Sequence, residues 1–395
     1  MFGKQGIVFL IFILCAKLLS PYEFGIYNYV LAIIFFLIIF GDFGISTATS
    51  KYVAEYNVTD KNKLKSVLFN SGIIILGLTI LITILTVIIG PLYLKEKYVY
   101  VLYLLPLIFL AQMTSLYDGI YRGLKRFKSL AIISLIVGLI SLSFVYFLIK
   151  QYGLIGALWA QNIFYLLLFI SLALGYREFN FKINKEVMRE IGKYSLIVGI
   201  AGLGFFLFTR VNILILGYFG YITEIGYYEL VNKIILILLI PSSILAQVIA
   251  PDITSLYYKK DKQKLISKYK KYMWFSLIIG VITALFTFFA FPILVKYFLI
   301  NYNLEVILTS MNLLLVLLIS QSMSNLASVG FSTASGYAKL NMYFLLIFGV
   351  INVPLSIFLV KTYGFIGIIY STLVIKLCAD ILFVYFYWRI IPYLK

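Results

Sequence analysis

The sequence is built from apolar runs that carry no charged residue and are long enough to cross a membrane. A helix needs about 20 such residues to span roughly 30 Å of hydrocarbon. Lipid leaves an open strand edge without hydrogen-bond partners, so these runs are expected to be helices. The seven clear runs are Val67–Ile89, Tyr98–Tyr117, Ser129–Ile149, Gln151–Tyr176, Tyr272–Val295, Val306–Ala338 and Leu340–Val360.

Four further apolar runs contain an embedded charge, and a shorter one opens the sequence. They are Phe24–Ser50 with Asp42, Tyr194–Thr223 with Arg210, Leu230–Pro251 with Lys233, Thr362–Trp388 with Lys376 and Asp380, and the short Gln5–Leu19. Together with the clear runs they predict about twelve transmembrane helices. The expected class is therefore an all-α polytopic membrane protein.

Composition supports the assignment to a membrane and excludes several classes of function. Hydrophobic residues make up 63% of the chain and charged residues 12%, whereas about a quarter of residues are charged in soluble domains. The sequence has no His, which removes the usual metal ligand and the usual general base near neutral pH. Cys15 and Cys378 lie in apolar runs without metal-type spacing, so buried, inert thiols are expected. No cofactor is predicted.

One stretch of the chain occurs twice. Glu23–Lys65 aligns without a gap with Glu224–Ile266, at a spacing of 201 residues. A second pair of matching segments, Lys150–Gly156 and Lys361–Gly367, follows at a spacing of 211 residues. Such self-similarity indicates a duplicated unit of about 200 residues.

The distribution of Lys and Arg predicts the orientation. If the N-terminus is inside, 24 of the 33 basic residues fall in cytoplasmic segments, 6 in external segments and 3 within spans. This asymmetry predicts a protein of the cell membrane with both termini in the cytoplasm. In a soluble protein the net charge of +18 would suggest nucleic acid, but here it reflects topology and attraction to anionic lipid. No nucleic-acid partner is predicted.

The duplication predicts two lobes of six helices each. Because each repeat has an even number of spans, both enter the membrane in the same sense, and their pseudo-twofold axis follows the membrane normal. The predicted boundaries are an N-terminal lobe at 1–176, a cytoplasmic linker at 177–193 and a C-terminal lobe at 194–395. The linker sequence is compatible with either a solvated loop or an amphipathic segment at the membrane interface.

The first segment has some features of a signal peptide, with Lys4 before an apolar stretch. It lacks the small-residue cleavage pattern at Ala16–Leu19, so we expect it to be retained as a short first span. A start further upstream in the gene is an alternative explanation for its shortness.

Several motifs resemble a known family. They are Leu18–Tyr27, Gly41–Ile45, Tyr121–Phe127, Arg210–Gly217 running into Glu224–Tyr228, and the two Tyr-Gly-x-Ile-Gly motifs. In this order they resemble the Wzx-type polysaccharide-biosynthesis flippases of the multidrug/oligosaccharidyl-lipid/polysaccharide (MOP) exporter superfamily. The resemblance implies a MATE-like fold of two six-helix lobes around a central cavity. It also implies alternating-access transfer of a lipid-linked oligosaccharide from the inner to the outer leaflet.

Arg210 is the principal candidate for substrate binding. A charge at the bilayer centre costs about 2.5–3.5 kcal/mol on insertion scales, so it needs a partner, water or a function. A guanidinium facing a cavity can hold a phosphate with two hydrogen bonds. The alternative is a structural pair with Glu224 or Glu229, and the residues alone leave both interpretations open.

Other basic residues are weaker candidates for the same role. Lys233 follows Glu229 by four residues and Lys376 precedes Asp380 by four, so each pair shares a helix face and can neutralise itself. Lys17 either lines the cavity or extends to lipid headgroups.

Two cytoplasmic basic residues and two acids complete the candidate set. Lys51 and Arg122 mark the cytoplasmic ends of lobe one, where a phosphate substrate would enter, although attraction to the leaflet charge explains them equally well. Asp42 and Asp380 are the candidates for coupling to a cation or proton. For Asp42 the alternative is a hydrogen-bonded residue in helix packing.

Three functions therefore compete. The first is a flippase for oligosaccharide on a polyprenyl phosphate or pyrophosphate, with glycosyltransferases of the same pathway and membrane lipid as partners. The second is a cation-coupled multidrug exporter of the same superfamily. The third is a membrane-embedded glycosyltransferase, which the short external loops disfavour, so the chain is not expected to be an enzyme. No Gly-x4-Gly-Lys-Ser/Thr motif is present, so the energy would come from gradients rather than from ATP on this chain.

Overall fold

The computed structural model describes residues 2–178 and 180–390, and within these ranges every regular element is a helix. The all-α class expected from the apolar runs is confirmed. The chain divides into two compact units, Met1–Leu203 and Gly204–Lys395, which are treated separately below. Lys395, counted above as cytoplasmic, lies outside the described residues.

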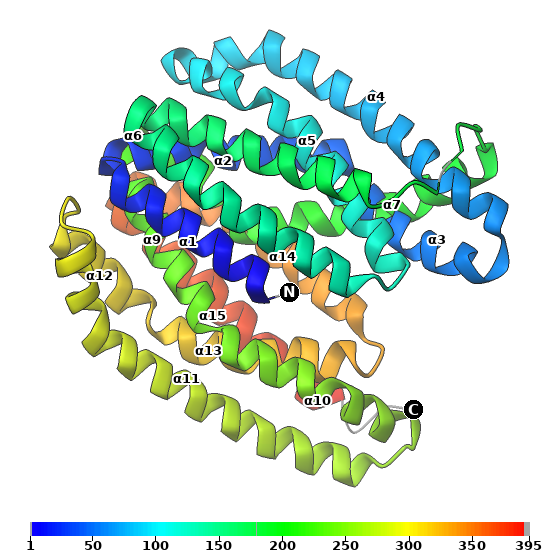
Figure 1. Ribbon diagram of the computed structural model, residues 1–395. Helices are drawn as coiled ribbons and strands as arrows, with labels where there is room; N and C mark the ends of the chain where they lie inside the picture. Colours follow the sequence, from blue (N-terminus) through cyan, green and yellow to red (C-terminus); the bar gives the residue numbers. More distant parts are fainter. Residues whose placement is uncertain (1, 179, 391–395) are drawn as a thin grey trace. The chain divides into compact units, whose positions relative to one another are not determined.

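The helices follow one another with short connections (Figure 1). Unit 1 contains α1 (Phe2–Leu18), α2 (Pro21–Asp42), α3 (Ile45–Thr59), α4 (Lys61–Leu94), η1 (Lys95–Lys97), α5 (Tyr98–Gly123), α6 (Phe127–Leu174) and most of α7 (Lys185–Thr209). Unit 2 contains α8 (Val211–Tyr218), α9 (Ile222–Leu238), α10 (Ile240–Tyr258), α11 (Lys262–Phe298), α12 (Leu304–Leu314), α13 (Val316–Asn325), η2 (Leu326–Thr333), α14 (Ala338–Tyr363) and α15 (Phe365–Ile390).

The described helices can account for the predicted membrane crossings by length and composition. Eight helical stretches are long and apolar enough to cross a membrane, a ninth is a pair of helices bent by 42°, and the shorter Gly6–Leu18 is also apolar. Two of the eight stretches turn back on themselves, Lys61–Gly123 at η1 and Phe127–Leu174 at Gly153. Counting each leg separately, and adding the bent pair and Gly6–Leu18, gives twelve segments among the described residues, the number of spans expected.

The two Tyr-Gly-x-Ile-Gly motifs form the same hairpin in each unit. Gly153 adopts φ 55° and ψ −130°, and Gly364 adopts φ 62° and ψ −142°, a region open essentially to glycine alone. A Cβ on Gly156 would lie 2.0 Å from the carbonyl oxygen of Leu148. The equivalent distance in unit 2, from Gly367 to the Leu359 carbonyl, is 2.1 Å. The matching segments at a spacing of 211 residues therefore encode a tight turn between two packed helices.

The Asp-Lys pairs of the repeat start equivalent helices. The Asp60 carboxylate accepts hydrogen bonds from the backbone N–H groups of Asn62 and Lys63 at the start of α4. The Asp261 carboxylate accepts one from Lys264 at the start of α11, and this bond lowers the pKa of Asp261. Both aspartates cap helices as their side-chain chemistry predicts.

One predicted span is wrong in its extent. The run Phe24–Ser50 forms two helices, because α2 ends at Asp42 and α3 begins at Ile45. Between them Phe43 and Gly44 have positive φ values of 36° and 83°. A Cβ on Gly44 would lie 2.7 Å from the Val198 side chain of α7. The turn is therefore fixed by close packing against α7.

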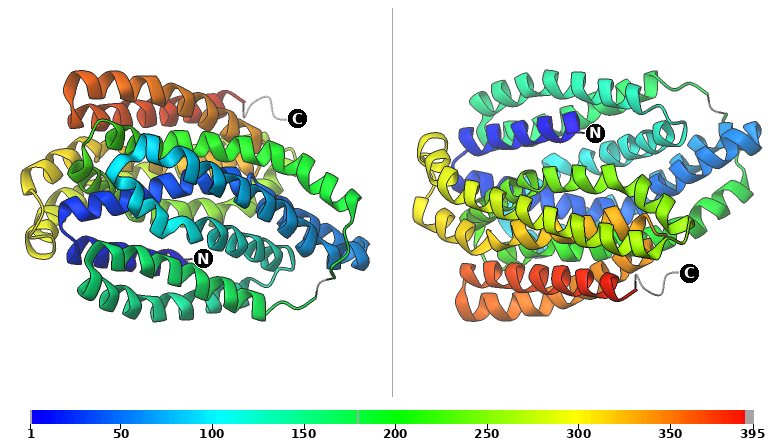
Figure 2. Two further views of the ribbon diagram at one scale, coloured as in Figure 1. Left: turned by 90° about the horizontal axis from the view of Figure 1, so that it is seen from above. Right: turned by 90° about the horizontal axis from the view of Figure 1, so that it is seen from below.

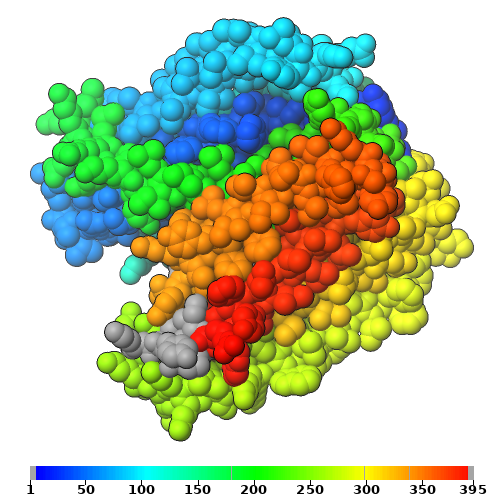
Figure 3. Space-filling model, turned by 180° about the vertical axis from the view of Figure 1, so that it is seen from behind, coloured from blue at the N-terminus to red at the C-terminus, as the bar shows by residue number. Residues whose placement is uncertain are grey.

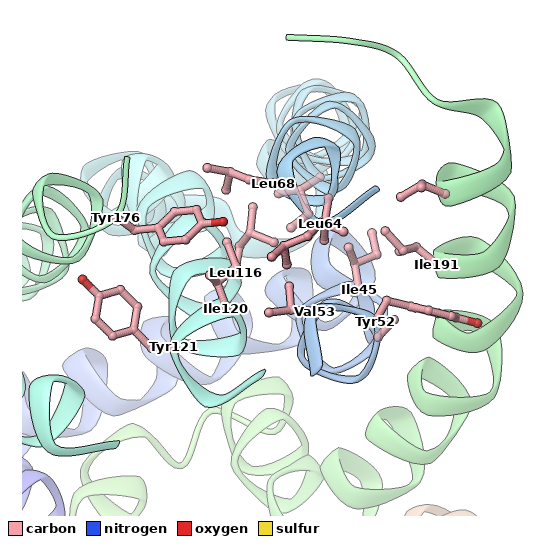
Figure 4. Close-up of a cluster of buried hydrophobic side chains, with 14 of the residues drawn as sticks. Ile45, Tyr52, Val53, Leu64, Leu68, Leu116, Ile120, Tyr121, Tyr176 and Ile191 are labelled. Carbon is pink, nitrogen blue, oxygen red and sulfur yellow. The ribbon is translucent and has the colours of Figure 1, made fainter. Parts of the chain in front are cut away.

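The core of unit 1 lies among α3, α4, α5 and the start of α7 (Figure 4). Ile45 and Val53 of α3 pack with Leu64 of α4, Leu116 of α5 and Ile191 of α7, and all five are buried. Burying a side chain of this size contributes about 1.5–3 kcal/mol where it would otherwise be exposed to water. This core anchors the beginning of α7.

The predicted linker packs against unit 1. The backbone N–H of Asn180 donates to the Lys65 carbonyl at 2.9 Å. The Asn70 side chain donates to the Lys182 carbonyl and accepts from the Asn184 N–H. These bonds tie the segment to α4, while the boundaries proposed at 176 and 193 stay a prediction.

In unit 2, α14 and α15 lie side by side along their length (Figures 2 and 3). Large apolar side chains on the outer face of α15, including Ile381 and Phe386, are exposed, as is expected of a face that contacts lipid. Cys15 is buried, but Cys378 is exposed on α15. The expectation that both thiols are buried is wrong for Cys378, because an apolar run does not reveal which of its faces meets lipid.

Candidate functional site

The helix that begins in the linker breaks at Arg210. α7 ends at Thr209 and α8 begins at Val211, with Arg210 between them at φ −128° and ψ −19°. The run Tyr194–Thr223 therefore contains two helices instead of the single helix that was expected. Non-helical backbone at membrane depth is tolerated only where protein or water satisfies its polar groups. The break marks a polar site inside an apolar element.

The Arg210 guanidinium pairs with Glu229 of α9. Nη1 of Arg210 donates a hydrogen bond to Oε2 of Glu229 at 3.0 Å. The Glu229 side chain is 4% exposed and that of Arg210 is 30% exposed. A guanidinium carries five N–H donors in a planar fork, so one bond to Glu229 leaves donor capacity on the accessible edge of Arg210. Pairing with Glu229 and binding of an anion are thus compatible.

Two lysines extend this pair into a larger group of charges. Lys233 lies one turn after Glu229 on α9 and interacts electrostatically with both Arg210 and Glu229. Nζ of Lys376, on α15, lies 3.5 Å from Oδ1 of Asn232 and interacts with Asp380, Glu229 and Arg210. The charges that the sequence scatters over three runs therefore meet in one place.

Asp380 lies at the edge of this group nearest α13. Its Oδ2 accepts a hydrogen bond of 2.8 Å from the Ser320 hydroxyl, and Lys376 lies one turn before it on α15. We call Arg210, Glu229, Lys233, Lys376 and Asp380 the charged cluster. Three cationic side chains against two carboxylates give it an excess of positive charge.

The cluster has the chemistry of an anion site. Arg holds phosphate bidentately, and Lys adds a compact charge with three donors. Within a low-dielectric environment such charges attract an anion more strongly than they do in water. A phosphate or pyrophosphate entering the site would meet the positive excess at Arg210.

A buried polar network lies next to the cluster and was not anticipated from the sequence. Asn212 of α8 donates to the Thr372 hydroxyl at 2.8 Å and to the Tyr228 hydroxyl at 3.1 Å. Its Oδ1 accepts from Asn352 and Ser356 of α14, both at 3.1 Å. The network ties α8, α9, α14 and α15 together and holds the helix break in place. In the sequence, the spacing of Asn352 and Ser356 by one helical turn is the feature that could have indicated this network.

The remaining basic candidates belong to unit 1. Lys17 is exposed in the last turn of α1. Nζ of Lys51 lies 3.9 Å from Glu55 and 4.3 Å from the ring centre of Tyr52. Arg122 forms an ion pair with Asp118 one turn earlier on α5. A role for Lys17, Lys51 and Arg122 in substrate binding stays a prediction.

Lys51 and Arg122 are carried on two helices that pack closely. A Cβ on Gly119 of α5 would lie 2.4 Å from the Ser46 carbonyl of α3, and one on Gly123 would lie 2.7 Å from the Ser50 carbonyl. Small residues spaced by four positions permit such close helix contacts in membranes. The crossing fixes the two basic residues on neighbouring elements.

Asp42 lies at the junction of α2 and α3. Its Oδ1 accepts a hydrogen bond of 3.1 Å from the backbone N–H of Ser46 and a second from the Ser46 hydroxyl. This geometry suits a carboxylate that caps the start of α3. Coupling to a cation at Asp42 stays a prediction.

Residues 1–257 match the family described as "Polysaccharide biosynthesis protein". The sequence has no significant match among curated proteins. Among solved structures, several of similar fold are described as transporters of the MOP superfamily.

An inward-facing multidrug resistance MATE family transporter of that superfamily has a TM-score of 0.85 and 16% identity, with 99% of this chain and 95% of that chain covered. The lipid II flippase MurJ, in an inward closed conformation, has a TM-score of 0.80 and 18% identity, with coverages of 98% and 85%. A MOP superfamily transporter from Pyrococcus furiosus, described by the reverse polarity of its binding pocket, has a TM-score of 0.62 and 17% identity, with coverages of 100% and 97%. These likenesses establish the fold.

Proposed function

Since this chain belongs to the polysaccharide biosynthesis protein family, we propose that it is a flippase for oligosaccharide carried on a polyprenyl phosphate or pyrophosphate. Family and fold together make the chain a multi-pass membrane transporter. The proposal adds the substrate class and the direction, from the inner to the outer leaflet. It also adds the cell membrane as location, with both termini in the cytoplasm.

The observation that carries the proposal is the charged cluster with Arg210 at the helix break. Its positive excess at membrane depth suits the phosphate that links lipid to sugar. A carboxylate-dominated site would suit a cationic drug instead. One protein of similar fold is described as a lipid II flippase.

Transport by alternating access is the mechanism that we propose. Solved MOP structures of similar fold are described as inward-facing and outward-facing. In this scheme the phosphate binds at Arg210 from the cytoplasmic side and is released on the outer side. Glycosyltransferases of the same pathway would supply the substrate.

Reconstitution tests the proposal. The purified protein would be placed in liposomes with a fluorescent polyprenyl-pyrophosphate oligosaccharide in both leaflets, and a membrane-impermeant quencher would report the outer pool. We expect the protein to accelerate exchange between leaflets, and an excess of unlabelled lipid-linked oligosaccharide to compete. Exchange no faster than in protein-free liposomes would contradict the proposal.

A cation-coupled multidrug exporter is the second candidate. The likeness to a multidrug resistance MATE transporter, with a TM-score of 0.85, favours it, as does the carboxylate of Asp380 within the cluster. The same liposomes, loaded with a fluorescent lipophilic cation and given an inward proton or sodium gradient, would detect this activity. Gradient-driven movement of the cation, without exchange of the oligosaccharide lipid, would favour the exporter.

A further inference from the structure

A groove runs along unit 2, between α11 and α15, apart from the helix break at Arg210. Its volume is about 750 Å³, within the usual size range of ligand sites. α13 packs against both α11 and α15 and forms the floor. The side chains along it are almost all apolar or aromatic. They include Tyr269, Met273, Trp274, Met323, Ile381 and Trp388.

One end of the groove is aromatic and basic. The rings of Tyr269 and Trp388 stack with centroids 5.6 Å apart, and Nζ of Lys270 lies 5.4 Å from the Trp388 ring centre. This end belongs to the Lys-rich segment 259–271. Trp and Tyr gather at the level of lipid headgroups, and basic clusters attract anionic leaflets.

The other end of the groove lies near the middle of α15, at Leu377. Asp380, whose carboxylate accepts from Ser320, lies between the two ends. Leu377 precedes Trp388 by eleven residues on α15, which corresponds to about 16 Å at 1.5 Å per residue. That length is close to one leaflet of a hydrocarbon core of about 30 Å. The groove is therefore shaped for one hydrocarbon chain rather than for a sugar.

We propose that this groove binds an anionic phospholipid of the leaflet that faces the Lys-rich segment. One acyl chain lies along α13 between Trp274 and Ile381, and the phosphate sits beside Lys270. Charge complementarity selects the anionic headgroup, because the basic end of the groove offers Lys270 where a phosphate would emerge. Of the charged cluster, Asp380 lines the groove, whereas its three cationic side chains, Arg210, Lys233 and Lys376, do not. The proposed phosphate position beside Lys270 is therefore distinct from the one proposed at Arg210.

Native mass spectrometry of the detergent-purified chain tests this binding. The protein would be titrated with phosphatidylglycerol or with phosphatidylcholine of the same acyl chains. We expect tighter binding of phosphatidylglycerol, and we expect Lys270→Gln to lose about fivefold in affinity for it while keeping its affinity for phosphatidylcholine. Lys271→Gln, at the exposed neighbouring position outside the groove, is the matched control and should bind as the wild type does.

A second pair of variants tests the chain-binding part of the groove. Ile381 is 61% exposed and lines the groove, whereas Leu382 is 41% exposed and does not. Ile381→Trp should fill the groove and weaken binding of both lipids by about tenfold or more, while Leu382→Trp should bind normally. Both changes lie on an exposed face, and melting curves would verify that both variants fold.

A photoreactive phosphatidylglycerol supplies a test on the unmodified protein. With a diazirine in the acyl chain, it should label peptides of α11 and α15. Labelling confined to other helices would overturn the proposal, as would equal affinity of the wild type for the two lipids or normal binding by Ile381→Trp. Labelling by a photoreactive polyprenyl phosphate that phosphatidylglycerol cannot displace would also overturn it, by assigning the groove to the substrate.

Discussion

Arg210 donates a 3.0 Å hydrogen bond to Glu229, and the two residues belong to different helices of unit 2. The bond joins a cation at a helix break to a carboxylate that is almost wholly buried. Removing either side chain leaves the other without this hydrogen-bonded partner in a low-dielectric environment. The pair therefore has a structural role whether or not Arg210 also binds substrate, and the two roles require different measurements.

The structural role predicts a loss of stability in Arg210→Ala that a second mutation restores. Removing one partner of a buried ion pair costs about 3–5 kcal/mol, and we expect the lower end here because Arg210 is partly exposed. Glu229→Gln in the same chain removes the buried carboxylate that has lost its hydrogen bond to Arg210. Thermal melting in detergent should show a lower midpoint for Arg210→Ala and a midpoint near that of the wild type for the double variant.

A non-additive result of this kind is the signature of direct coupling between neighbours. Equal and additive decreases in the midpoint for Arg210→Ala and Glu229→Gln would contradict the pairing. The melting midpoint of Lys233→Gln is a useful comparison with these variants, because Lys233 lies on the same helix as Glu229 and adds to the positive excess of the charged cluster.

The acids of the two units are expected to respond differently to loss of charge. For the cation-coupled alternative, Asp380→Asn removes a carboxylate from the charged cluster, so stimulation of transport by a proton or sodium gradient should disappear. Asp42→Asn keeps an oxygen that can accept from the Ser46 N–H, so transport should stay near that of the wild type. Transport would be measured in liposomes with and without each gradient. Loss of transport in Asp42→Asn, with normal insertion, would instead assign coupling to Asp42.

The hairpin glycines predict a stability difference between two Gly→Ala changes. Gly153→Ala forces a Cβ onto a backbone at φ 55° and ψ −130°, which costs about 1–3 kcal/mol. Gly77→Ala, in the middle of α4 with open space around it, should leave the melting midpoint unchanged or raise it slightly. Equal midpoints for the two variants would show that the turn at Gly153 is not required.

Much of this architecture could be predicted because the membrane constrains sequence so strongly. Charge-free runs reveal spans, and the recurrence of Asp60-Lys61 and Tyr152–Gly156 reveals the duplication. Each recurrent motif proved to be a helix cap or a turn. Such local geometry depends on a few residues that lie close together in sequence.

The helix ends and the cluster were harder to predict, for physical reasons. No charged residue follows Asp42 until Lys51, and apolar runs flank Arg210 on both sides, so the sequence did not reveal that α2 and α7 end there. Packing of Gly44 against Val198 fixes the first break, and that contact is distant in sequence. The sequence leaves Glu224 and Glu229 as alternative partners for Arg210, since sequence spacing does not tell which helices lie side by side. The presence of Lys376, on α15, in the same cluster could not be predicted for the same reason.

The orientation predicted from basic residues is open to direct test. A reporter fused after Lys395, or inserted within residues 255–271, should be cytoplasmic, and one inserted at 95–97 should be external. Paired enzymatic reporters that are active on only one side of the membrane would measure this. The opposite labelling at any of these positions would invert the topology and remove the proposed entry of substrate from the cytoplasm.

The central claim is that Arg210 binds the phosphate of a lipid-linked oligosaccharide, and the double variant Arg210→Ala, Glu229→Gln tests it most directly. This variant restores the charge balance of the broken pair, so its stability should match that of the wild type while the guanidinium is absent. The measurement is its rate of exchange of fluorescent polyprenyl-pyrophosphate oligosaccharide in liposomes, beside Arg210→Lys, which keeps the charge without the planar fork. We predict wild-type melting with transport lost in the double variant and partly retained in Arg210→Lys. Wild-type exchange by the stable double variant would contradict the claim and leave Arg210 with a structural role alone.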